Sequence, residues 1–363
     1  MTFSLPDASS LDVPGPSAES VTRYESFAFT GSGSEYFRIW IVNILLSVMT
    51  LGIYSAWAKV RTQRYFYRHT RIAGASFDYH GQPLAILKGR IVSVVLFGGY
   101  YIANIVSPEA GGIAFLVLVA LLPWLIMRSL KFRLANSSYR GLRFRFTGTT
   151  REAYWIFVGL PALSLLTLFG LVPFWHHRLK RYQHGHSWYG KTRFTFAAPV
   201  SAFYKAYGVA ALSTLGLIVV TLFLFGMVLG TVGVFGGRTE AAQNLAVVIV
   251  LIAYILIFTG VWALTTALLQ NVVWRHTSLG PHRFSSTLEA HRLVTLALTN
   301  MLATVCTVGL FRPFAEVRLA RYQAGELTLI RTGDLGEFVG EEQAGVNAVG
   351  EEMMEIFDID LSL

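Results

Sequence analysis

Three basic segments carry the side chains of this sequence that are best suited to chemistry. All three have the pattern Arg-x-x-Arg-Tyr, and the residues are Arg61, Arg64, Tyr65, Arg178, Arg181, Tyr182, Arg318, Arg321 and Tyr322. A spacing of three puts both guanidinium groups on one helix face. Guanidinium groups bind phosphate through paired hydrogen bonds, so the segments predict contacts with anionic lipid headgroups. The alternative is that they are ordinary positive-inside anchors, with the tyrosines in an aromatic belt.

Other chemistry-bearing patterns are weak. Four histidines, His176, His177, His184 and His186, lie beside the second segment. They have no acidic or cysteine partner nearby in sequence, and His184 and His186 lack the i, i+4 spacing of a helical metal site. Nucleophile-elbow, zinc-protease and phosphate-loop motifs are missing. We therefore predict no catalytic, cofactor or metal site, and a protein that is not an enzyme.

The elements that carry these segments are apolar. Of the 363 residues, 53% are hydrophobic and only 14% are charged, with a mean hydropathy of +0.50. Blocks free of Lys, Arg, Asp and Glu cover residues 39–58, 91–108, 110–127, 153–175, 207–236, 245–274 and 293–311. A helix needs roughly 20 apolar residues to cross a bilayer. The sequence therefore predicts a polytopic membrane protein.

The three basic segments belong to longer stretches that align with one another. Residues 50–65 align without a gap on residues 167–182 and 307–322, and each stretch begins with a threonine. These matches predict three internal repeats, about 27–80, 144–197 and 284–330, separated by transmembrane hairpins at about 84–130 and 204–274. In each repeat an apolar helix should break before the basic turn, and the expected breaks are Gly52, Gly170, Pro173, Gly309 and Pro313.

Charge and alternating aromatics predict how the repeats sit in the membrane. If every apolar block crossed, the basic residues of 128–145 and of 178–181 would lie on opposite sides, against the positive-inside rule. Re-entrant repeat helices remove the conflict. Residues 27–30 should pair with 77–79, and 144–147 with 194–196, as small cytoplasmic strand pairs. The fold class expected is an all-α helical bundle of four spans and three broken, re-entrant helices, with six to eight ordinary spans as the alternative.

The two ends of the chain differ from the apolar middle. Residues 1–24 are rich in Ser, Pro and Asp and predict a disordered tail, and residues 25–330 form the expected membrane domain. Residues 331–363 form an acidic tail. On a chain of net charge +9, this tail could fold over the basic surface or remain solvated. Both termini are expected on the cytoplasmic side.

A family resemblance adds a location. The run from Thr50 through Trp57 to Tyr65, followed by His69 and Gly74, resembles the YjgN-like bacterial inner-membrane proteins, a domain family of unknown function. The resemblance covers roughly residues 25–330 and implies a multi-pass protein of the bacterial cytoplasmic membrane, without an established activity. The second and third segments depart from the pattern by carrying Phe174 and Phe314 in place of Trp57.

Two functions follow from these features. The broken helices and the basic face favour transport or lipid handling, because broken helices in repeats frame binding sites in known transporters. The lack of charge within the spans and the acidic tail favour a non-catalytic membrane scaffold or assembly partner. The expected partners are membrane lipids with anionic headgroups. No nucleic-acid partner, cofactor or specific protein partner is indicated.

Overall fold

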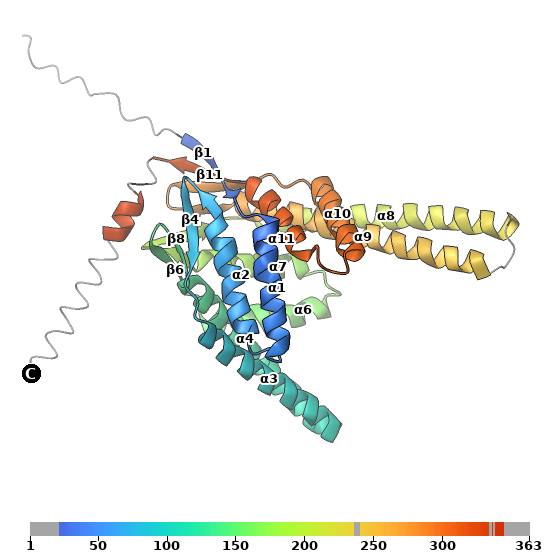
Figure 1. Ribbon diagram of the computed structural model, residues 1–363, viewed down its shortest axis with the longest axis horizontal. Helices are drawn as coiled ribbons and strands as arrows, with labels where there is room; N and C mark the ends of the chain where they lie inside the picture. The colour runs from blue at the N-terminus through green and yellow to red at the C-terminus, as the bar shows by residue number, and fades with distance from the viewer. Residues whose placement is uncertain (1–21, 236–239, 334–335, 337, 345–363) are drawn as a thin grey trace, which may run out of the picture.

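The chain forms one antiparallel sheet from which pairs of helices extend (Figure 1). The structure is a computed structural model that describes residues 22–235, 240–333, 336 and 338–344. Within these residues the sheet has eleven strands in the order β1-β11-β10-β9-β8-β7-β6-β5-β4-β3-β2. The strands are β1 (Thr22–Ser26), β2 (Ala28–Phe29), β3 (Thr70–Ile72), β4 (Ala75–Tyr79), β5 (Ser137–Tyr139), β6 (Leu142–Phe146), β7 (Ser187–Tyr189), β8 (Thr192–Phe196), β9 (Thr277–Leu279), β10 (His282–Ser286) and β11 (Leu327–Thr332).

The sheet curls into a nearly closed β-barrel. β1 and β2 are the two ends of the strand order, yet only Phe27 separates them in the chain. β1 pairs with β11 and β2 pairs with β3, so this one segment joins both edges. The Phe27 amide donates to the Leu327 carbonyl oxygen at 2.9 Å, which continues the pairing across the junction. Closure removes the unpaired edges that an open sheet would expose.

The barrel corrects two predictions. The fold is not an all-α bundle with small strand pairs, because a single sheet of eleven strands organises the described residues. The predicted partners are also wrong: β2 pairs with β3 rather than with β4, and β6 pairs with β7 rather than with β8. Four of the strands that were not predicted are three residues long and directly follow helices, so they have too few positions to show an alternating pattern; they are β3, β5, β7 and β9.

Five helical hairpins join neighbouring strands among the described residues. Each leaves one strand of the barrel and returns to the strand paired with it, so both ends of every hairpin lie at the barrel. The first hairpin is α1 (Gly33–Met49) and α2 (Ser55–His69), and the second is α3 (Pro83–Val106) and α4 (Pro108–Ala135). The third is α5 (Thr150–Tyr154), the π-helix η1 (Trp155–Gly159), α6 (Leu160–Leu166) and α7 (Val172–Gly185). The fourth is α8 (Val200–Phe235) and α9 (Glu240–Arg275), and the fifth is α10 (Ala290–Cys306) and α11 (Arg312–Gly325).

The hairpins are of two kinds. Among the described residues, four helices are long and apolar enough to cross a membrane, namely α3, α4, α8 and α9. The first, third and fifth hairpins, which contain the aligned basic segments, are shorter. Their longest helices have 17 residues, or about 25 Å at 1.5 Å per residue. The tips of these hairpins are apolar and exposed, with Leu51 at 95%, Leu168 at 88% and Val308 at 93% exposure.

A recurring threonine ends the first helix of each short hairpin. The Thr50 hydroxyl donates to the Leu46 carbonyl oxygen at 2.7 Å and accepts from the Tyr54 amide at 2.9 Å. Thr167 and Thr307 make the same two bonds in the third and fifth hairpins. One hydroxyl thus adds a second hydrogen bond to a carbonyl of the last helical turn, which also accepts from the threonine amide, and accepts from an amide of the turn that follows.

The expected break residues lie at these turns, in two different roles. Gly52 and Gly309 have φ values of +89° and +90°, which L-residues rarely adopt, and Phe169 takes the corresponding place in the third hairpin at +65°. Gly170 follows Phe169 in that turn. Pro173 and Pro313 instead lie in the first turn of α7 and α11, where a missing amide proton costs nothing. The prolines therefore begin the second helix of the hairpin.

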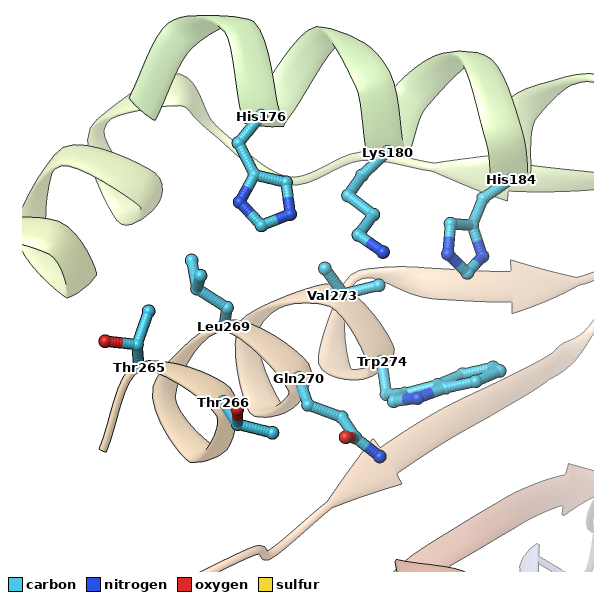
Figure 2. A pocket seen from close by; sticks show the side chains of 9 residues that line it. All are labelled: His176, Lys180, His184, Thr265, Thr266, Leu269, Gln270, Val273 and Trp274. Atoms are coloured by element: carbon cyan, nitrogen blue, oxygen red, sulfur yellow. The ribbon is translucent and has the colours of Figure 1, made fainter. Parts of the chain in front are cut away.

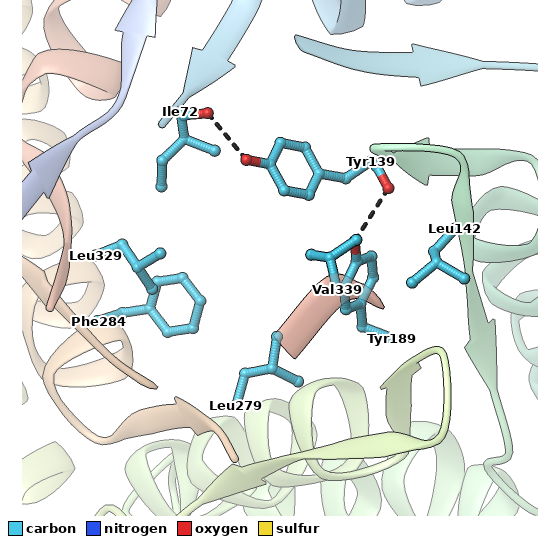
Figure 3. Packing of buried hydrophobic residues seen from close by; sticks show 8 residues of the cluster. All are labelled: Ile72, Tyr139, Leu142, Tyr189, Leu279, Phe284, Leu329 and Val339. Atoms are coloured by element: carbon cyan, nitrogen blue, oxygen red, sulfur yellow. Dashed lines mark hydrogen bonds between the residues drawn. The ribbon is translucent and has the colours of Figure 1, made fainter. Parts of the chain in front are cut away.

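Aromatic and aliphatic side chains fill the interior of the barrel (Figure 3). Five phenylalanines line the interior and are here called the phenylalanine ring. Phe27 lies at the junction of β1 and β2, and Phe77, Phe144, Phe194 and Phe284 lie on β4, β6, β8 and β10. The centroids of successive rings are 6.3–6.4 Å apart. A second layer contains Tyr139 and Tyr189, whose hydroxyls donate to the carbonyl oxygens of Ile72 and Tyr139 at 2.9 and 3.0 Å. Because alternate strand residues face one side, this layered core follows from the strand register.

The chain ends only partly match the expected boundaries. Residues 22–24 of the predicted tail belong to β1, and residues 1–21 lie outside the described residues. At the other end, residues 331 and 332 complete β11. Residues 338–344 of the acidic tail are helical, and their Val339 points into the barrel core (Figure 3). The Glu342 carboxylate accepts hydrogen bonds from the Lys191 amide and the Thr192 hydroxyl, so this helix closes over the β7–β8 turn.

Candidate functional site

The three Arg-x-x-Arg-Tyr segments lie on α2, α7 and α11, the returning helices of the short hairpins. Their tyrosines are structural. The hydroxyls of Tyr65, Tyr182 and Tyr322 donate to the carbonyl oxygens of Ser32, Thr149 and Glu289 at 2.8, 3.1 and 3.3 Å. Each bond ties the basic helix to the start of the first helix of its own hairpin. This recurring contact accounts for the tyrosine at the fifth position of the pattern.

The arginines of the first and fifth hairpins are engaged within the protein. Arg61 donates to the Tyr54 hydroxyl at 2.9 Å, and Arg64 donates to the Tyr79 carbonyl oxygen at 3.4 Å. Arg318 donates to Oδ1 of Asn300 at 2.7 Å. Arg321 donates to the Gly31 carbonyl oxygen at 2.9 Å. These four guanidinium groups therefore have part of their hydrogen-bonding capacity used.

The arginines of the third hairpin differ. Among the described residues, Arg178 and Arg181 have no hydrogen-bond or ion-pair partner, and Arg178 only stacks on the Phe174 ring at 5.2 Å. Both are exposed, as is Arg151 of α5. The three line an open cleft of about 480 Å³, here called the arginine cleft, with Glu152, Trp155, Ile156, Tyr182 and His186. Three free guanidinium groups at one cleft are a suitable site for an anion.

A π-helix shapes the floor of the arginine cleft. Trp155 and Ile156 belong to η1, where the backbone widens by one residue, a feature that is frequent at functional sites. Trp175 of α7 donates from Nε1 to the Ile156 carbonyl oxygen at 2.7 Å, so the widened turn is held against the basic helix. Trp155 stays 54% exposed. The cleft therefore combines cations with an exposed indole, which suits the headgroup region of a bilayer.

One carboxylate lies at the edge of the arginine cleft. Glu152 caps the start of α5 with Thr149, and its Oε2 is 3.2 Å from Nε2 of His186. In the first hairpin, Glu35 and His69 form the same pair at a longer 3.9 Å. Because His186 is paired with Glu152, the carboxylate does not contact the guanidinium groups. The arginine side chains remain available to an anionic ligand.

The opposite face of α7 lines a second cleft (Figure 2), here called the histidine–lysine cleft. His176, Lys180 and His184 follow one another at intervals of four and point toward Thr265, Thr266 and Gln270 of α9. The cleft has a volume of about 440 Å³. Burial, with Lys180 nearby, lowers the pKa of His184 to about 4, and burial also lowers the pKa of the Lys180 amine. His184 is therefore uncharged at neutral pH.

The histidines of the sequence cluster separate in the structure. His184 and His186 line different clefts, and His177 is buried with its Nε2 2.9 Å from the Ala198 carbonyl oxygen. In the described part of the chain, no group of three or more His, Cys, Asp or Glu side chains is arranged to hold a metal ion.

Sequence reasoning missed Arg151, Trp155 and Lys180, although a signal was present. Asn300, which binds Arg318, aligns with Asn43 in the first hairpin but with Leu160 in the third. Tyr54, which binds Arg61, aligns with Leu171. The fifth hairpin keeps Asn300 but carries Phe311 in place of Tyr54, so the third hairpin is the copy in which neither polar side chain is present. The loss of both distinguishes the copy whose arginines have no partner among the described residues.

Comparisons with known proteins identify a family and relatives of this chain. A family model described as "Bacterial protein of unknown function (DUF898)" matches residues 24–356. The inner membrane protein YjgN of Salmonella typhimurium is 33% identical over 149 residues, which are 40% of this chain and 37% of that protein. The inner membrane protein YjgN of Escherichia coli K12 is 33% identical over 147 residues, 39% of this chain and 36% of that protein. The chain thus aligns with less than two fifths of these relatives, and no solved structure matches it.

Proposed function

The chain belongs to the bacterial DUF898 family, whose members include YjgN-like proteins, and we propose that it is a lipid-handling protein of the bacterial inner membrane that holds an anionic headgroup in the arginine cleft. One observation carries this proposal. Arg178 and Arg181 have no hydrogen-bond partner among the described residues, whereas the aligned arginines of the first and fifth hairpins do. A guanidinium group that the fold leaves free, beside two others, is positioned for a phosphate.

The proposal includes a multi-pass arrangement with both termini in the cytoplasm. It is supported by the four long apolar helices, and by the inner-membrane relatives named above. β1 and β11, the first and last strands, are paired, so the two ends of the described chain lie together at the barrel. Exposed arginines such as Arg71, Arg143 and Arg145 extend from the barrel strands, as the positive-inside rule requires of a cytoplasmic element.

The short hairpins would enter the membrane by their tips and return. Support comes from the exposed apolar residues Leu51, Leu168 and Val308 at the three turns, and from helices slightly shorter than the roughly 30 Å of hydrocarbon. In this arrangement α6 directs its apolar end, with Leu166 80% exposed, into the acyl chains. Trp155 and the arginine cleft then lie nearer the barrel, at the depth of the headgroups.

We also propose that the three short hairpins are internal repeats of one ancestral unit. Support comes from the threonine that ends the first helix with the same two hydrogen bonds in each of them. Leu51, Leu168 and Val308 also share φ values of 49°, 49° and 50°. In this interpretation the third unit has specialised by losing the polar partners of its arginines.

Native mass spectrometry of the detergent-purified protein tests the headgroup proposal. Arg178→Gln combined with Arg181→Gln should lower retention of phosphatidylglycerol about tenfold, while retention of zwitterionic phosphatidylethanolamine stays unchanged. The matched control combines Arg71→Gln with Arg143→Gln, which removes the same charge from exposed strand positions. This control should retain phosphatidylglycerol like the native protein.

Two outcomes would overturn the proposal. Phosphatidylglycerol retention could be equal in the native protein and in the Arg178/Arg181 variant, or it could fall equally in the control variant. The second outcome would mean that bulk charge, rather than the arginine cleft, attracts the lipid. Either result would favour the alternative, a non-catalytic membrane scaffold.

A further inference from the structure

The barrel encloses a cavity that the proposed function does not use. Its volume is about 200 Å³, and the lining is entirely apolar at its surface. The walls come from the phenylalanine ring and from Leu279, Leu329 and Trp274, and Phe338 of the C-terminal helix closes one end. An engineered apolar cavity of about 150 Å³ stays dry and binds benzene, so this space has the size of a small substituted aromatic ring.

One polar side chain in the cavity wall is unsatisfied. His282 of β10 is 1% exposed, and neither of its ring nitrogens has a hydrogen-bond partner among the described residues. The Phe338 ring stands perpendicular to it with centroids 4.8 Å apart. That geometry offers at most a weak N–H···π contact to one nitrogen. A buried imidazole without partners is unfavourable, so its position calls for a partner that the described protein does not provide.

The other polar groups of the wall are occupied. Tyr139 and Tyr189 donate their hydroxyl protons to backbone carbonyl oxygens of neighbouring strands. Burial, with Arg331 nearby, lowers the pKa of His282, so its imidazole is neutral at pH 7 and carries one donor and one acceptor. A water molecule normally needs two to four polar partners, and here His282 alone is available. An organic hydroxyl on an apolar ring satisfies both the histidine and the surrounding phenylalanines.

We propose that the barrel interior is a binding site for a small phenol-like molecule. Its ring packs within the phenylalanine ring, and its hydroxyl pairs with His282 once the Phe338 ring, which lies against the imidazole in the empty cavity, moves aside. The flat ring matches walls built from aromatic side chains, which favour offset and edge-to-face contacts. The C-terminal helix of residues 338–344 covers the cavity through Phe338 and Val339. A ligand therefore enters when this short segment moves aside. The site is independent of the arginine cleft, which lies in the third hairpin.

Fluorine NMR with two probes tests the site. 4-Fluorophenol and fluorobenzene have the same ring, and only the first has a hydroxyl. Full-length protein in detergent should bind 4-fluorophenol saturably, and unlabelled phenol should displace it. His282→Leu should weaken 4-fluorophenol binding about tenfold, the effect of one hydrogen bond, while fluorobenzene binding stays within twofold of the native value.

Cavity-filling variants separate the barrel site from partition into detergent. Leu279→Phe and Leu329→Phe add volume from different strands, and each should abolish saturable binding of both probes. Far-ultraviolet circular dichroism and the thermal unfolding temperature report whether each variant is folded. The proposal is overturned if native protein binds neither probe, if His282→Leu weakens both probes equally, or if a folded filling variant still binds 4-fluorophenol.

Discussion

Tyr36 in α1 donates a 2.8 Å hydrogen bond from its hydroxyl to Oε2 of Glu316 in α11, 280 residues away. The bond joins the first and fifth helical hairpins. A second bond, from Arg321 to the Gly31 carbonyl oxygen, spans the same junction at 2.9 Å. The helical layer is therefore closed by side chains at the place where the barrel is closed by β1 and β2. The chain ends depend on each other for their packing.

Tyr36→Phe should weaken this closure. Tyr36 is 2% exposed, and the variant removes a hydrogen bond to a carboxylate without changing the shape of the ring. We expect the free energy of unfolding in detergent to fall by about 1.5 kcal/mol, measured by denaturant titration. The control is Tyr24→Phe, because Tyr24 is 73% exposed and should lose nothing measurable. Equal stability of the two variants would mean that the contact contributes no net stability.

Gly309→Ala should destabilise the fifth hairpin. Gly309 has a φ of +90°, and no atom lies within 4 Å of an added Cβ, so the effect is backbone strain without a steric clash. We expect a loss of about 1–2 kcal/mol in the free energy of unfolding. Gly99→Ala in α3 also meets no neighbouring atom but has helical geometry, so it should be neutral or slightly stabilising. If both substitutions behave alike, the turn conformation is not required for stability.

Glu342→Ala should release the helix that closes the barrel. The Glu342 carboxylate is 8% exposed and accepts bonds from Lys191 and Thr192, whereas the neighbouring Glu341 is exposed. Alanine preserves helix propensity in both variants. We expect amide hydrogen exchange in residues 338–344 to become about tenfold faster in Glu342→Ala and to stay unchanged in Glu341→Ala. Unchanged amide hydrogen exchange in both variants would show that apolar contacts alone hold the helix of residues 338–344 on the barrel.

Stability should depend on pH through His184. Burial keeps its pKa near 4 in the folded protein, against about 6.5 when unfolded, so the unfolded chain binds more protons between these values. The free energy of unfolding is therefore highest above pH 6.5 and decreases as pH falls from 6.5 toward 4. His184 faces Lys180 on its own helix and the uncharged Thr266, Gln270 and Trp274 of α9.

Replacing His184 isolates its contribution to this profile. His184→Gln should reduce the slope between pH 6.5 and 4 in thermal unfolding measurements, with a remainder from other buried histidines. His291→Gln is the control, because His291 is exposed and should leave the profile as it is in the native protein. An unaltered slope in His184→Gln would assign the acid sensitivity to other groups.

The barrel was only partly predictable from the sequence. Phe77, Phe144 and Phe194 lie on strands, as the alternating aromatics indicated, because alternation is a local property, and Phe27 lies at the junction of β1 and β2. Their partners could not be assigned, since every pairing across β4–β5 or β8–β9 depends on a helical hairpin bringing distant residues together. Closure through β1 and β11 joins residues about 300 positions apart, and no local pattern encodes it.

The sequence located two arginines of the candidate site, but it could not show whether their guanidinium groups are hydrogen-bonded or free. The pattern Arg-x-x-Arg-Tyr located Arg178 and Arg181, yet the same pattern occurs where the arginines are engaged. In the fifth hairpin Asn300, eighteen residues earlier, accepts from Arg318, whereas Leu160 takes this place in the third hairpin. Leu160 lies on α6 and Arg178 lies on α7. The importance of Leu160 for the arginine is therefore visible only in the three-dimensional structure.

Single-cysteine labelling tests the membrane arrangement. In a Cys306→Ser background, Ser76→Cys places a thiol on the exposed face of β4, and Glu109→Cys places one at the α3–α4 turn. With the barrel in the cytoplasm and α3 crossing the bilayer, a membrane-impermeant maleimide added to whole cells should label position 109, and it should label position 76 only after lysis. The reverse pattern would put the barrel outside. The only helix between positions 76 and 109 is α3, whose 24 residues are about 36 Å long and therefore sufficient to cross the bilayer. Labelling of both positions in intact cells would mean that α3 does not cross.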